Sequence, residues 1–350
     1  MKILYLYAEL MDYQISIFKE YVNNYDAQVH VFHWDNKKLT PYKPPILDNV
    51  IYYNKSEYNN NQLKEIVKSI NPDIVYISGW QDFDYFSVVY NLRKKGVPVV
   101  TGFDDQWRGT LKQRLGAFLF PFTLKRFYSH AWVSGPYQFE YARRMGFEKN
   151  KIIFNLLSGN TSLFGQGELH LKIKENNYPK SFLYVGNFRH RKGTDILVKA
   201  FKIYREKYNG EWRLTCVGNG EMQSLLENDT KIESIGFTKQ EGLIEIAKRS
   251  GVFILPSRLD QWGVAVHEFS SLGLPLILSE NVGAKAIFLI ENFNGISYKN
   301  NSPENLAEAM SFISQKKDSE LIEMGQRSIQ LSKSISPSTS AANFVSIKCK

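Results

Sequence analysis

Cysteine is scarce in this sequence of 350 residues, and long apolar runs are absent from it. Cys216 and Cys349 are the only cysteines. They are too few and too far apart for a disulfide framework or a zinc site, so a reducing cytoplasm is the simplest location. The longest apolar candidate, Leu115 to Leu124, has ten residues and contains Pro121, whereas a membrane span needs about 18. The apolar start of the chain, Ile3 to Ala8, is too short for a signal peptide.

The overall composition is ordinary, but the charge is unevenly distributed. Apolar residues make up 43% and charged residues 23% of the chain, as in typical globular proteins, and the length suggests about two domains. The net charge is +9, and residues 88–151 alone carry 12 Lys or Arg against 4 Asp or Glu. A basic stretch of this kind predicts an anionic partner, such as nucleic acid, an acidic lipid or a phosphorylated substrate. A solvated basic face is the alternative.

Strand patterns alternate with helical patterns through the first half of the chain. Strands are expected at residues 2–7, 29–32, 73–78 and 97–101, and helices at 11–22, 62–70 and 83–95. Residues 36–45 contain three prolines and are expected to form a loop. The alternation predicts a parallel sheet covered by helices on both faces, which places the protein in the α/β class.

The alternation pauses and then begins again in the second half. Strands are expected at 152–154, 181–186, 212–217, 252–255 and 275–279, and helices at 195–208, 222–227, 240–248 and 264–272. We place the junction between the two predicted domains between about residues 158 and 178. The prediction is therefore a first domain of residues 1–160 and a second of residues 175–335, with the tail at about 336–350 packing back on the first.

Several stretches of the second half occur in an order found in a known enzyme family. They are Tyr184 to Asp195, Cys216 to Glu221, Ile235 to Phe237, Val252 to Glu268, Gly273 to Pro275 and Asn294-Gly295. Together they resemble the family-4 retaining glycosyltransferases of the GT-B fold, over about residues 181 to 310. The resemblance implies two Rossmann-like parallel-sheet domains facing an interdomain cleft. The first domain would bind the acceptor and the second a nucleotide sugar.

Two acidic residues carry the most specific part of this resemblance. Asp260 and Glu268 follow the acidic-x7-acidic pattern, the first in a loop and the second about one turn into a helix that starts near Val264. Free amides at a helix start bind phosphate. Because one acid lies before this helix start and the other lies beyond it, both carboxylates can reach hydroxyls on either side of a diphosphate bound there. In the family the first acid, usually Glu, contacts the donor sugar and the second contacts the ribose. The donor site so implied comprises Gly186, Asn187, Arg189, Lys192, Gly236, Phe237, Asp260, Gln261, Trp262, Gly263, Val264 and Glu268.

Basic residues follow the first strand of the second domain. Lys192 precedes Gly193 and a helix start, where a lysine can neutralise diphosphate oxygens. The family usually has Arg directly after the strand's glycine, where this chain has Asn187, and Arg189 is the expected substitute. Two cations over a leaving diphosphate do the work of a metal ion, so the reaction is predicted to be metal-independent. Solvated bases on a loop are the alternative.

The first domain departs from the family at the position of a frequent histidine. Phe103 stands where many relatives have His, so Asp104 or Asp105 is the best candidate to contact the sugar or the incoming hydroxyl. Both follow the strand at 97–101, and parallel sheets bind ligands at the carboxyl ends of their strands. An Asp-rich turn is the alternative. Residues 8–12 lack the glycine-rich phosphate loop that many relatives have after the first strand.

No metal site is predicted. Asp82-Phe83-Asp84 matches an Asp-x-Asp motif that holds metal in the other large glycosyltransferase fold. A lone match is weak, and Asp82 is better explained as a helix N-cap. The six histidines show no ligand spacing.

The basic stretch also has an aromatic component. Residues 111–127 contain the cations Lys112, Arg114, Lys125 and Arg126 and the aromatics Phe118, Phe120 and Phe122. This mixture suits a membrane interface with anionic head groups, and in the family the first domain often receives a lipid-linked acceptor at the cytoplasmic membrane face. RNA binding would use similar residues, but no recognition motif is visible. A core helix with snorkelling ends is the other alternative.

The resulting prediction is a retaining, metal-independent glycosyltransferase without a cofactor. It transfers a sugar from a UDP- or GDP-linked donor to a saccharide or lipid-linked acceptor, with Asp104, Asp105, Asp260 and Lys192 as catalytic candidates. By analogy of fold it acts in bacterial surface polysaccharide or lipopolysaccharide assembly, in the cytoplasm or on the inner face of the membrane. A nucleotide-sugar epimerase of the same fold and a non-catalytic nucleotide-sugar-binding protein remain as alternatives.

Overall fold

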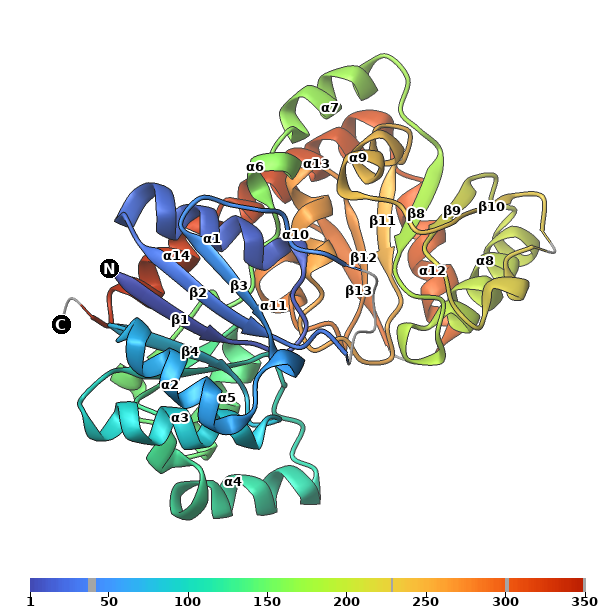
Figure 1. The fold of residues 1–350 in the computed structure, drawn as a ribbon. Coiled ribbons are helices and arrows are strands. Elements are labelled where there is room, and N and C mark those ends of the chain that lie inside the picture. Colours follow the sequence, from blue (N-terminus) through green and yellow to red (C-terminus); the bar gives the residue numbers. More distant parts are fainter. Residues whose placement is uncertain (37–41, 228, 300–301, 349–350) are drawn as a thin grey trace. The chain divides into compact units, whose positions relative to one another are not determined.

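The chain divides into two compact units, each built around its own sheet (Figure 1). The computed structural model describes residues 1–36, 42–227, 229–299 and 302–348. The first unit consists of Met1–Asn160 and the chain from Ile335 onward, and the second of Thr161–Ser334. Cys349 and residues 37–41 of the expected proline-rich loop lie outside the described residues. No helix formed by the described residues has the length and apolar character needed to span a membrane.

The first unit contains a parallel sheet in the order β3-β2-β1-β4-β5-β6-β7. Its strands are β1 (Lys2–Leu6), β2 (Gln28–His33), β3 (Val50–Asn54), β4 (Ile74–Ser78), β5 (Val99–Phe103), β6 (His130–Val133) and β7 (Ile152–Ile153). Its helices are α1 (Asp12–Tyr25), α2 (Asn60–Ile70), α3 (Phe83–Lys94), α4 (Leu111–Thr123), α5 (Pro136–Arg144) and α14 (Pro337–Val345). Short 3-10 turns lie at η1 (Lys55–Glu57), η2 (Lys125–Phe127) and η3 (Lys149–Lys151).

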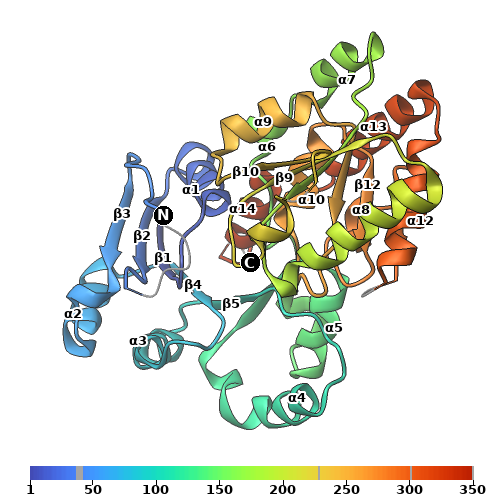
Figure 2. The same cartoon turned by 90° about the vertical axis from the view of Figure 1, so that its right-hand side faces the viewer.

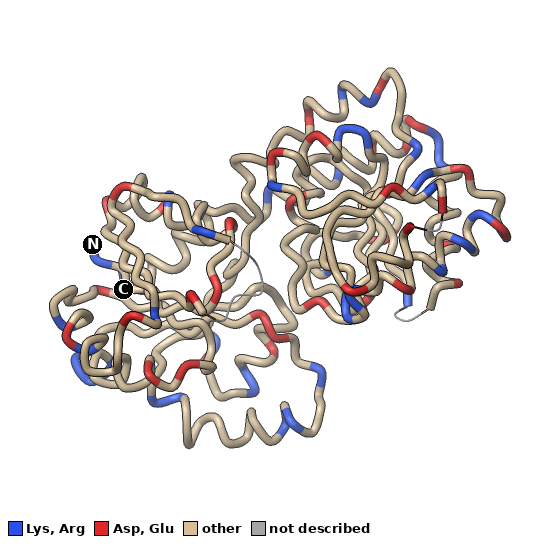
Figure 3. The backbone as a smooth tube through the Cα atoms, turned by 45° about the vertical axis from the view of Figure 1, so that its right-hand side comes forward, with Lys and Arg blue, Asp and Glu red and all other residues tan. Residues whose placement is uncertain are grey.

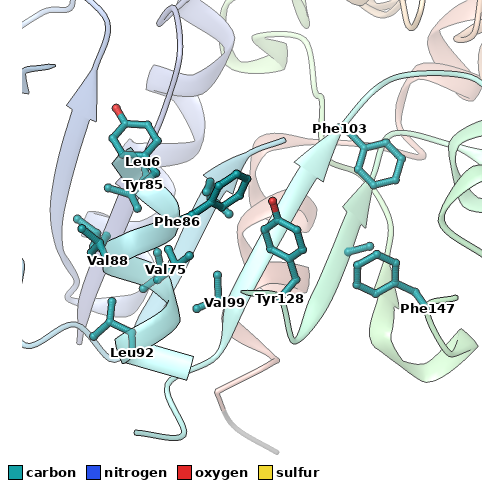
Figure 4. Packing of buried hydrophobic residues seen from close by; sticks show 14 of the residues in the cluster. Leu6, Val75, Tyr85, Phe86, Val88, Leu92, Val99, Phe103, Tyr128 and Phe147 are labelled. Atoms are coloured by element: carbon teal, nitrogen blue, oxygen red, sulfur yellow. The ribbon is translucent and has the colours of Figure 1, made fainter. Parts of the chain in front are cut away.

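Both faces of this sheet are buried, which explains its almost continuous apolar strands. On one face, side chains such as Leu6, Val75 and Val99 meet Phe86 and Leu92 from α3 (Figure 4). Side chains alternate along a strand, so the intervening residues point to the other face. There α14 lies beside α1 in Figure 1 and covers aromatic residues of the strands. Phe344 of α14 stacks on Trp132 of β6 with ring centroids 5.1 Å apart.

The second unit contains a parallel sheet in the order β10-β9-β8-β11-β12-β13. Its strands are β8 (Ser181–Val185), β9 (Arg213–Val217), β10 (Ile232–Ile235), β11 (Val252–Leu255), β12 (Leu276–Ser279) and β13 (Gly295–Tyr298). Its helices are α6 (Thr161–Phe164), α7 (Gly167–Glu175), α8 (Thr194–Tyr208), α9 (Gln240–Lys248), α10 (Val264–Ser271), α11 (Lys285–Phe288), α12 (Pro303–Ser314) and α13 (Asp318–Ser332), with 3-10 turns η4 (His190–Lys192) and η5 (Gln223–Leu225). Helices α8 and α12 lie side by side in Figure 2.

Some expected elements differ from the structure. Residues 161–174, which the sequence analysis left outside both domains, form α6 and most of α7 in the second unit. The expected helix at 222–227 is wrong, because only the 3-10 turn η5 forms there. The backbone amide of Met222 donates to the carbonyl of Phe188, and this bond to a distant loop replaces the local pattern of an α-helix.

A buried histidine in α7 gives the second unit a pH-dependent stability. His170 is fully buried, and both ring nitrogens are without a hydrogen-bond partner among the described residues. Burial lowers the pKa of His170 to about 4, and the nearby ammonium groups of Lys174 and Lys248 act in the same direction, against Glu245. An unfolded histidine titrates near 6.5. Between these values the unfolded chain binds a proton that the folded chain does not, so stability decreases as the pH falls.

We expect the free energy of unfolding to fall by roughly 3 kcal/mol between pH 6.5 and 4 through His170 alone. Urea unfolding of the wild type and of a His170→Leu variant at several pH values measures this contribution. The variant should lose that part of the pH dependence. An unchanged pH dependence in the variant would show that His170 is not buried in its neutral form.

Candidate active site

The carboxyl ends of β8 and β11 form the topological switch point of the second sheet. The two strands are neighbours, but β9 lies beyond β8 and β12 lies beyond β11. The connections that leave such a pair of strands diverge to opposite sides, and open α/β sheets bind ligands in the crevice between them. The segment 186–193 follows β8 and the segment 256–263 follows β11. The switch point therefore brings together the two segments that carry most of the predicted donor-binding residues.

Lys192 and Asp260 meet at this point. The Nζ atom of Lys192 lies 2.6 Å from Oδ2 of Asp260, and the side chains are only 24% and 9% exposed. The hydroxyl of Ser257 also donates to Oδ2, at 3.3 Å. A partly buried, charge-assisted hydrogen bond is stronger than a surface ion pair. The structure therefore places a cation and an anion in contact at the edge of the sheet.

A second ion pair connects the segment after β11 with the start of α8, the helix that follows the segment after β8. Arg258 donates two hydrogen bonds to the carboxylate of Asp195, at 2.6 and 2.7 Å, and a third to the carbonyl of His190. The guanidinium of Arg258 lowers the pKa of Asp195. Both residues lie within the motifs of the family resemblance, but no role was predicted for them. The only signal in the sequence was an Asp at the start of the helix after the first segment and an Arg in the second segment, and their pairing depends on the fold.

Gly193 allows the same two segments to approach closely. Its φ is +74°, and a Cβ atom at this position would lie 2.0 Å from the carbonyl oxygen of Pro256. Only glycine accepts both the positive φ and this contact. Lys192 is therefore held by a backbone turn that packs directly on the segment leading to Asp260.

Glu268 lies in α10, beyond the start of that helix. The helix begins after Gly263, which has a φ of +92°, and Glu268 is half-buried in its second turn. The side-chain amide of Gln240, the first residue of α9, donates to Oε1 of Glu268 at 3.2 Å. Gln240 was not predicted as part of the site. The first amides of α10 point out of the carboxyl edge of the sheet, where an anion is favoured.

The other predicted donor residues differ in accessibility. Asn187, Arg189, Gly236 and Phe237 are exposed at the ends of β8 and β10, and Gly186, Gln261, Gly263 and Val264 are half-buried. Trp262 requires a correction, because its side chain is 1% exposed and packs against Phe288. The Trp262 indole belongs to the core of the second unit, and the backbone carbonyl of this residue accepts the amide of Ala284.

The corresponding edge of the first sheet carries a separate cavity. It measures about 160 Å³ and lies at the ends of β1, β4 and β5. Asp104 and Asp105 line it together with the hydroxyl-bearing residues Tyr7, Tyr13 and Tyr76. Burial raises the pKa of each of these tyrosines, and the charge of Asp104 adds to the effect. The tyrosines therefore remain neutral hydrogen-bond donors beside a carboxylate.

The structure also shows the roles of Phe103, which replaces the family's histidine, and of the Asp-x-Asp motif at residues 82–84. Phe103 is buried and packs against Trp80, with ring centroids 5.6 Å apart, so it fills core space. Asp82 is the N-cap of α3 and accepts the backbone amide of Asp84. Asp84 forms an ion pair of 2.8 Å with Lys55. Among the described residues, no group of His, Cys, Asp and Glu is arranged to hold a metal ion.

Comparisons with known proteins identify the class of the second unit. Residues 166–329 match the sequence profile of the family described as glycosyl transferases group 1. This segment lies within the second unit, and it is the part of the chain that is similar to the family.

Three curated relatives agree with this assignment. Two are uncharacterized glycosyltransferases of Methanocaldococcus jannaschii, one 27% identical over 37% of this chain and 34% of the relative, the other 24% identical over 50% and 52%. The third is the 2-deoxystreptamine N-acetyl-D-glucosaminyltransferase of Niallia circulans, 25% identical over 31% of this chain and 30% of the relative. The alignments thus span about a third to a half of the length of these relatives.

Solved structures show the same fold over the whole chain. A glycosyltransferase from Rickettsia africae has a TM-score of 0.74 at 16% identity, covering 99% of this chain and 97% of the other. The HepE protein of Anabaena, solved in complex with UDP, has a TM-score of 0.74 at 13% identity and covers 99% of both chains. The fold of this protein is therefore GT-B, with two Rossmann-like parallel-sheet domains.

Proposed function

We propose that this protein is a retaining glycosyltransferase that uses a nucleotide sugar as donor. The observation that carries the proposal is the contact between Lys192 and Asp260 at the switch point of the second sheet. In the proposed complex, Lys192 turns to the diphosphate and Asp260 contacts hydroxyls of the sugar. Glu268 contacts the ribose, and the amides at the start of α10 contact phosphate oxygens. Arg189, which is exposed in the same segment, supplies a second cation.

The charge requirements of the reaction support this assignment of roles. Breaking the bond to the anomeric carbon leaves negative charge on the departing diphosphate, and cations fixed near that position stabilise the transition state. When the donor binds, the contact between Lys192 and Asp260 would be replaced by two contacts with the donor. Lys192 would meet the negative diphosphate, and Asp260 would accept hydrogen bonds from sugar hydroxyls. Arg258 and Gly193 act by positioning, since they hold the two segments together.

The acceptor is proposed to bind in the first unit, in the cavity of Asp104 and Asp105. Neutral tyrosine hydroxyls beside a carboxylate suit a polyhydroxylated ligand, because together they offer donors and an acceptor. A carboxylate near the incoming hydroxyl can also accept its proton. The acceptor class remains a saccharide or a lipid-linked saccharide. The proposed pathway is bacterial surface polysaccharide or lipopolysaccharide assembly, at the cytoplasmic side of the membrane.

The test is transfer itself. The protein is incubated with each of several UDP- and GDP-sugars, with and without acceptor sugars, in EDTA, and the products are followed by NMR. We expect donor cleavage to depend on acceptor, the anomeric configuration to be retained, and activity to survive the chelator. Isomerised donor without acceptor would instead identify an epimerase, and tight nucleotide binding without any turnover a non-catalytic binder. Loss of activity in EDTA with recovery in manganese would overturn metal independence.

The surface of α4 supports a further part of the proposal, contact with an anionic membrane. Five large apolar side chains, Leu111, Leu115, Phe118, Leu119 and Phe122, are exposed along α4. Their spacing places them on one stripe of the helix. The prediction for Phe120 is wrong, because this ring is buried on the opposite side and packs against Trp80, Tyr128 and Phe147.

The charge around α4 matches the same partner. Residues 106–139 contain no Asp or Glu, and the helix lies at the periphery of the first unit in both views (Figures 1 and 2). Acidic residues are common along the rest of the chain (Figure 3), so their absence from residues 106–139 leaves the charge of this segment positive. An apolar stripe with flanking cations favours a helix that lies in the plane of an anionic bilayer.

We expect the protein to bind vesicles of phosphatidylglycerol and phosphatidylcholine at low salt, and to bind pure phosphatidylcholine weakly. Replacing Phe118 and Phe122 together by Ser should reduce binding at least about tenfold, because two rings lose their apolar contact. Phe83→Ser is the matched control, since Phe83 is 78% exposed in the same unit outside α4. Sedimentation with vesicles measures the binding of the double variant and of the control. Equal loss in the control, or no binding at low ionic strength, would contradict the assignment of α4.

A further inference from the structure

The amino edge of the first sheet contains a hollow of about 360 Å³. It is lined by residues that precede β5, β6 and β7 or begin β6, among them Arg93, Lys125, His130, Glu148 and Lys151. The cavity of Asp104 and Asp105 lies at the opposite, carboxyl edge of the same sheet. The hollow is therefore separate from the proposed acceptor site, and a ligand bound in it takes no part in the proposed transfer.

The lining is strongly cationic. Arg93, Lys125 and Lys151 face a single acidic residue, Glu148. Among the described residues, none of these three cations forms an ion pair within 4.0 Å. Cations gathered in a concave surface focus their field and attract an anion.

Arg93 contributes a guanidinium to the lining of the hollow. Its Nε atom is buried and has no hydrogen-bond partner in the described part of the chain. A ligand in the hollow cannot reach this buried atom, so the proposal rests on the guanidinium's charge and on its other donors. The guanidinium also presents a planar set of donors that matches the oxygen atoms of phosphate.

The floor of the hollow limits what the ligand can be. Tyr128 and Phe147 are buried there, and Nζ of Lys125 lies 6.0 Å from the centre of the Phe147 ring. The same Nζ donates to the carbonyl of Gly146. The volume exceeds that of a bare phosphate and leaves room for a small polar substituent.

We propose that this hollow binds a phosphate group that carries a small polar substituent. Two sources share this chemistry, a soluble phosphate ester and the head group of an anionic phospholipid. The second is suggested by position, because Lys125 belongs to η2, which directly follows α4. The proposal goes beyond the glycosyltransferase function and stands if that function is disproved.

The first experiment uses the full-length protein with inorganic phosphate and glycerol phosphate in titration calorimetry. Arg93→Gln and Lys151→Gln should each weaken binding about tenfold or more, the scale of a charged hydrogen bond. Lys95→Gln is the matched control, since Lys95 is an exposed cation at the same end of α3 that does not line the hollow. Lys151 is exposed, so its variant remains informative if Arg93→Gln unfolds. The absence of saturable binding, or equal weakening in the control, overturns the proposal.

The second experiment separates the two sources. Vesicles of phosphatidylglycerol and phosphatidylcholine are titrated with wild type and with Lys151→Gln. If the variant binds vesicles several-fold more weakly and glycerol phosphate competes with the vesicles, the ligand is a lipid head group. If vesicle binding is unchanged while binding of free phosphate is lost, the hollow serves a soluble phosphate ester. Either result supports a phosphate site at this edge.

Discussion

Replacing Lys192 by Ala should lower the rate of sugar transfer about 100-fold or more, while donor affinity falls much less. The ammonium group lies at the proposed position of the leaving diphosphate, and charge on that group grows in the transition state. Removing one preorganised donor at such a position costs on the order of 100-fold to 1000-fold in turnover. The expected result is therefore a change in kcat, measured beside the dissociation constant of the donor from calorimetry.

The controls for Lys192 separate charge from structure. Lys202→Ala removes an exposed lysine of the adjacent helix α8, whose side chain is 71% exposed, and should leave turnover unchanged. Lys192→Ala also leaves the carboxylate of Asp260 without its cation, so a melting temperature is needed to show that the fold persists. A folded Lys192→Ala variant with wild-type turnover would refute the role of this residue.

Glu268→Ala should weaken binding of a nucleoside diphosphate by roughly 1–3 kcal/mol, or about 5-fold to 150-fold. The proposed contact is a charged hydrogen bond from the ribose hydroxyls to a half-buried carboxylate. The effect should appear with the free nucleotide, because the contact does not involve the sugar that is transferred. Calorimetry with UDP and GDP measures it and also reports which base is preferred.

Gln240 provides the comparison for Glu268. Its amide donates to the Glu268 carboxylate at 3.2 Å, so Gln240→Ala removes a positioning contact and keeps the charge. We expect a smaller loss of affinity than for Glu268→Ala. Unchanged nucleotide affinity in a folded Glu268→Ala variant would exclude Glu268 from the donor site.

Regular patterns of the sequence predict much of the fold, because each is a local consequence of burial. The run from Val252 to Leu255 is apolar throughout and forms β11 at those residues, between helices α9 and α10 in the chain. Helix α9 likewise forms at the expected residues Gln240–Lys248. The short strands β3 and β13 and the helices after residue 300 carry weaker patterns and were not predicted.

The candidate site is only partly readable from the sequence. The spacing of Asp260 and Glu268 identifies a motif, but not the contact of Asp260 with Lys192 across 68 positions of the chain. The pairing of Arg258 with Asp195 was missed for the same reason. A residue's neighbours in sequence cannot reveal a partner that reaches it only when β8 and β11 become adjacent in the sheet.

The sequence does not show which aromatic side chains are buried and which are exposed. Phe118 and Phe122 are exposed, whereas Phe120, between them, is 4% exposed. In a helix these three residues point in different directions, and only packing decides which side meets the core. Trp262 shows the same effect, since its motif position suggests a ligand contact and its ring fills the core.

By itself, the sequence determined the α/β class, the alternation of strands and helices and the acidic motif of the second domain. These follow from periodicity and spacing, which act over a few residues. Only the tertiary structure decided which cation meets Asp260, which side of α4 remains uncovered and how the chain end at α14 packs against α1. These contacts join residues that are distant in the chain, and the order of the parallel strands creates them.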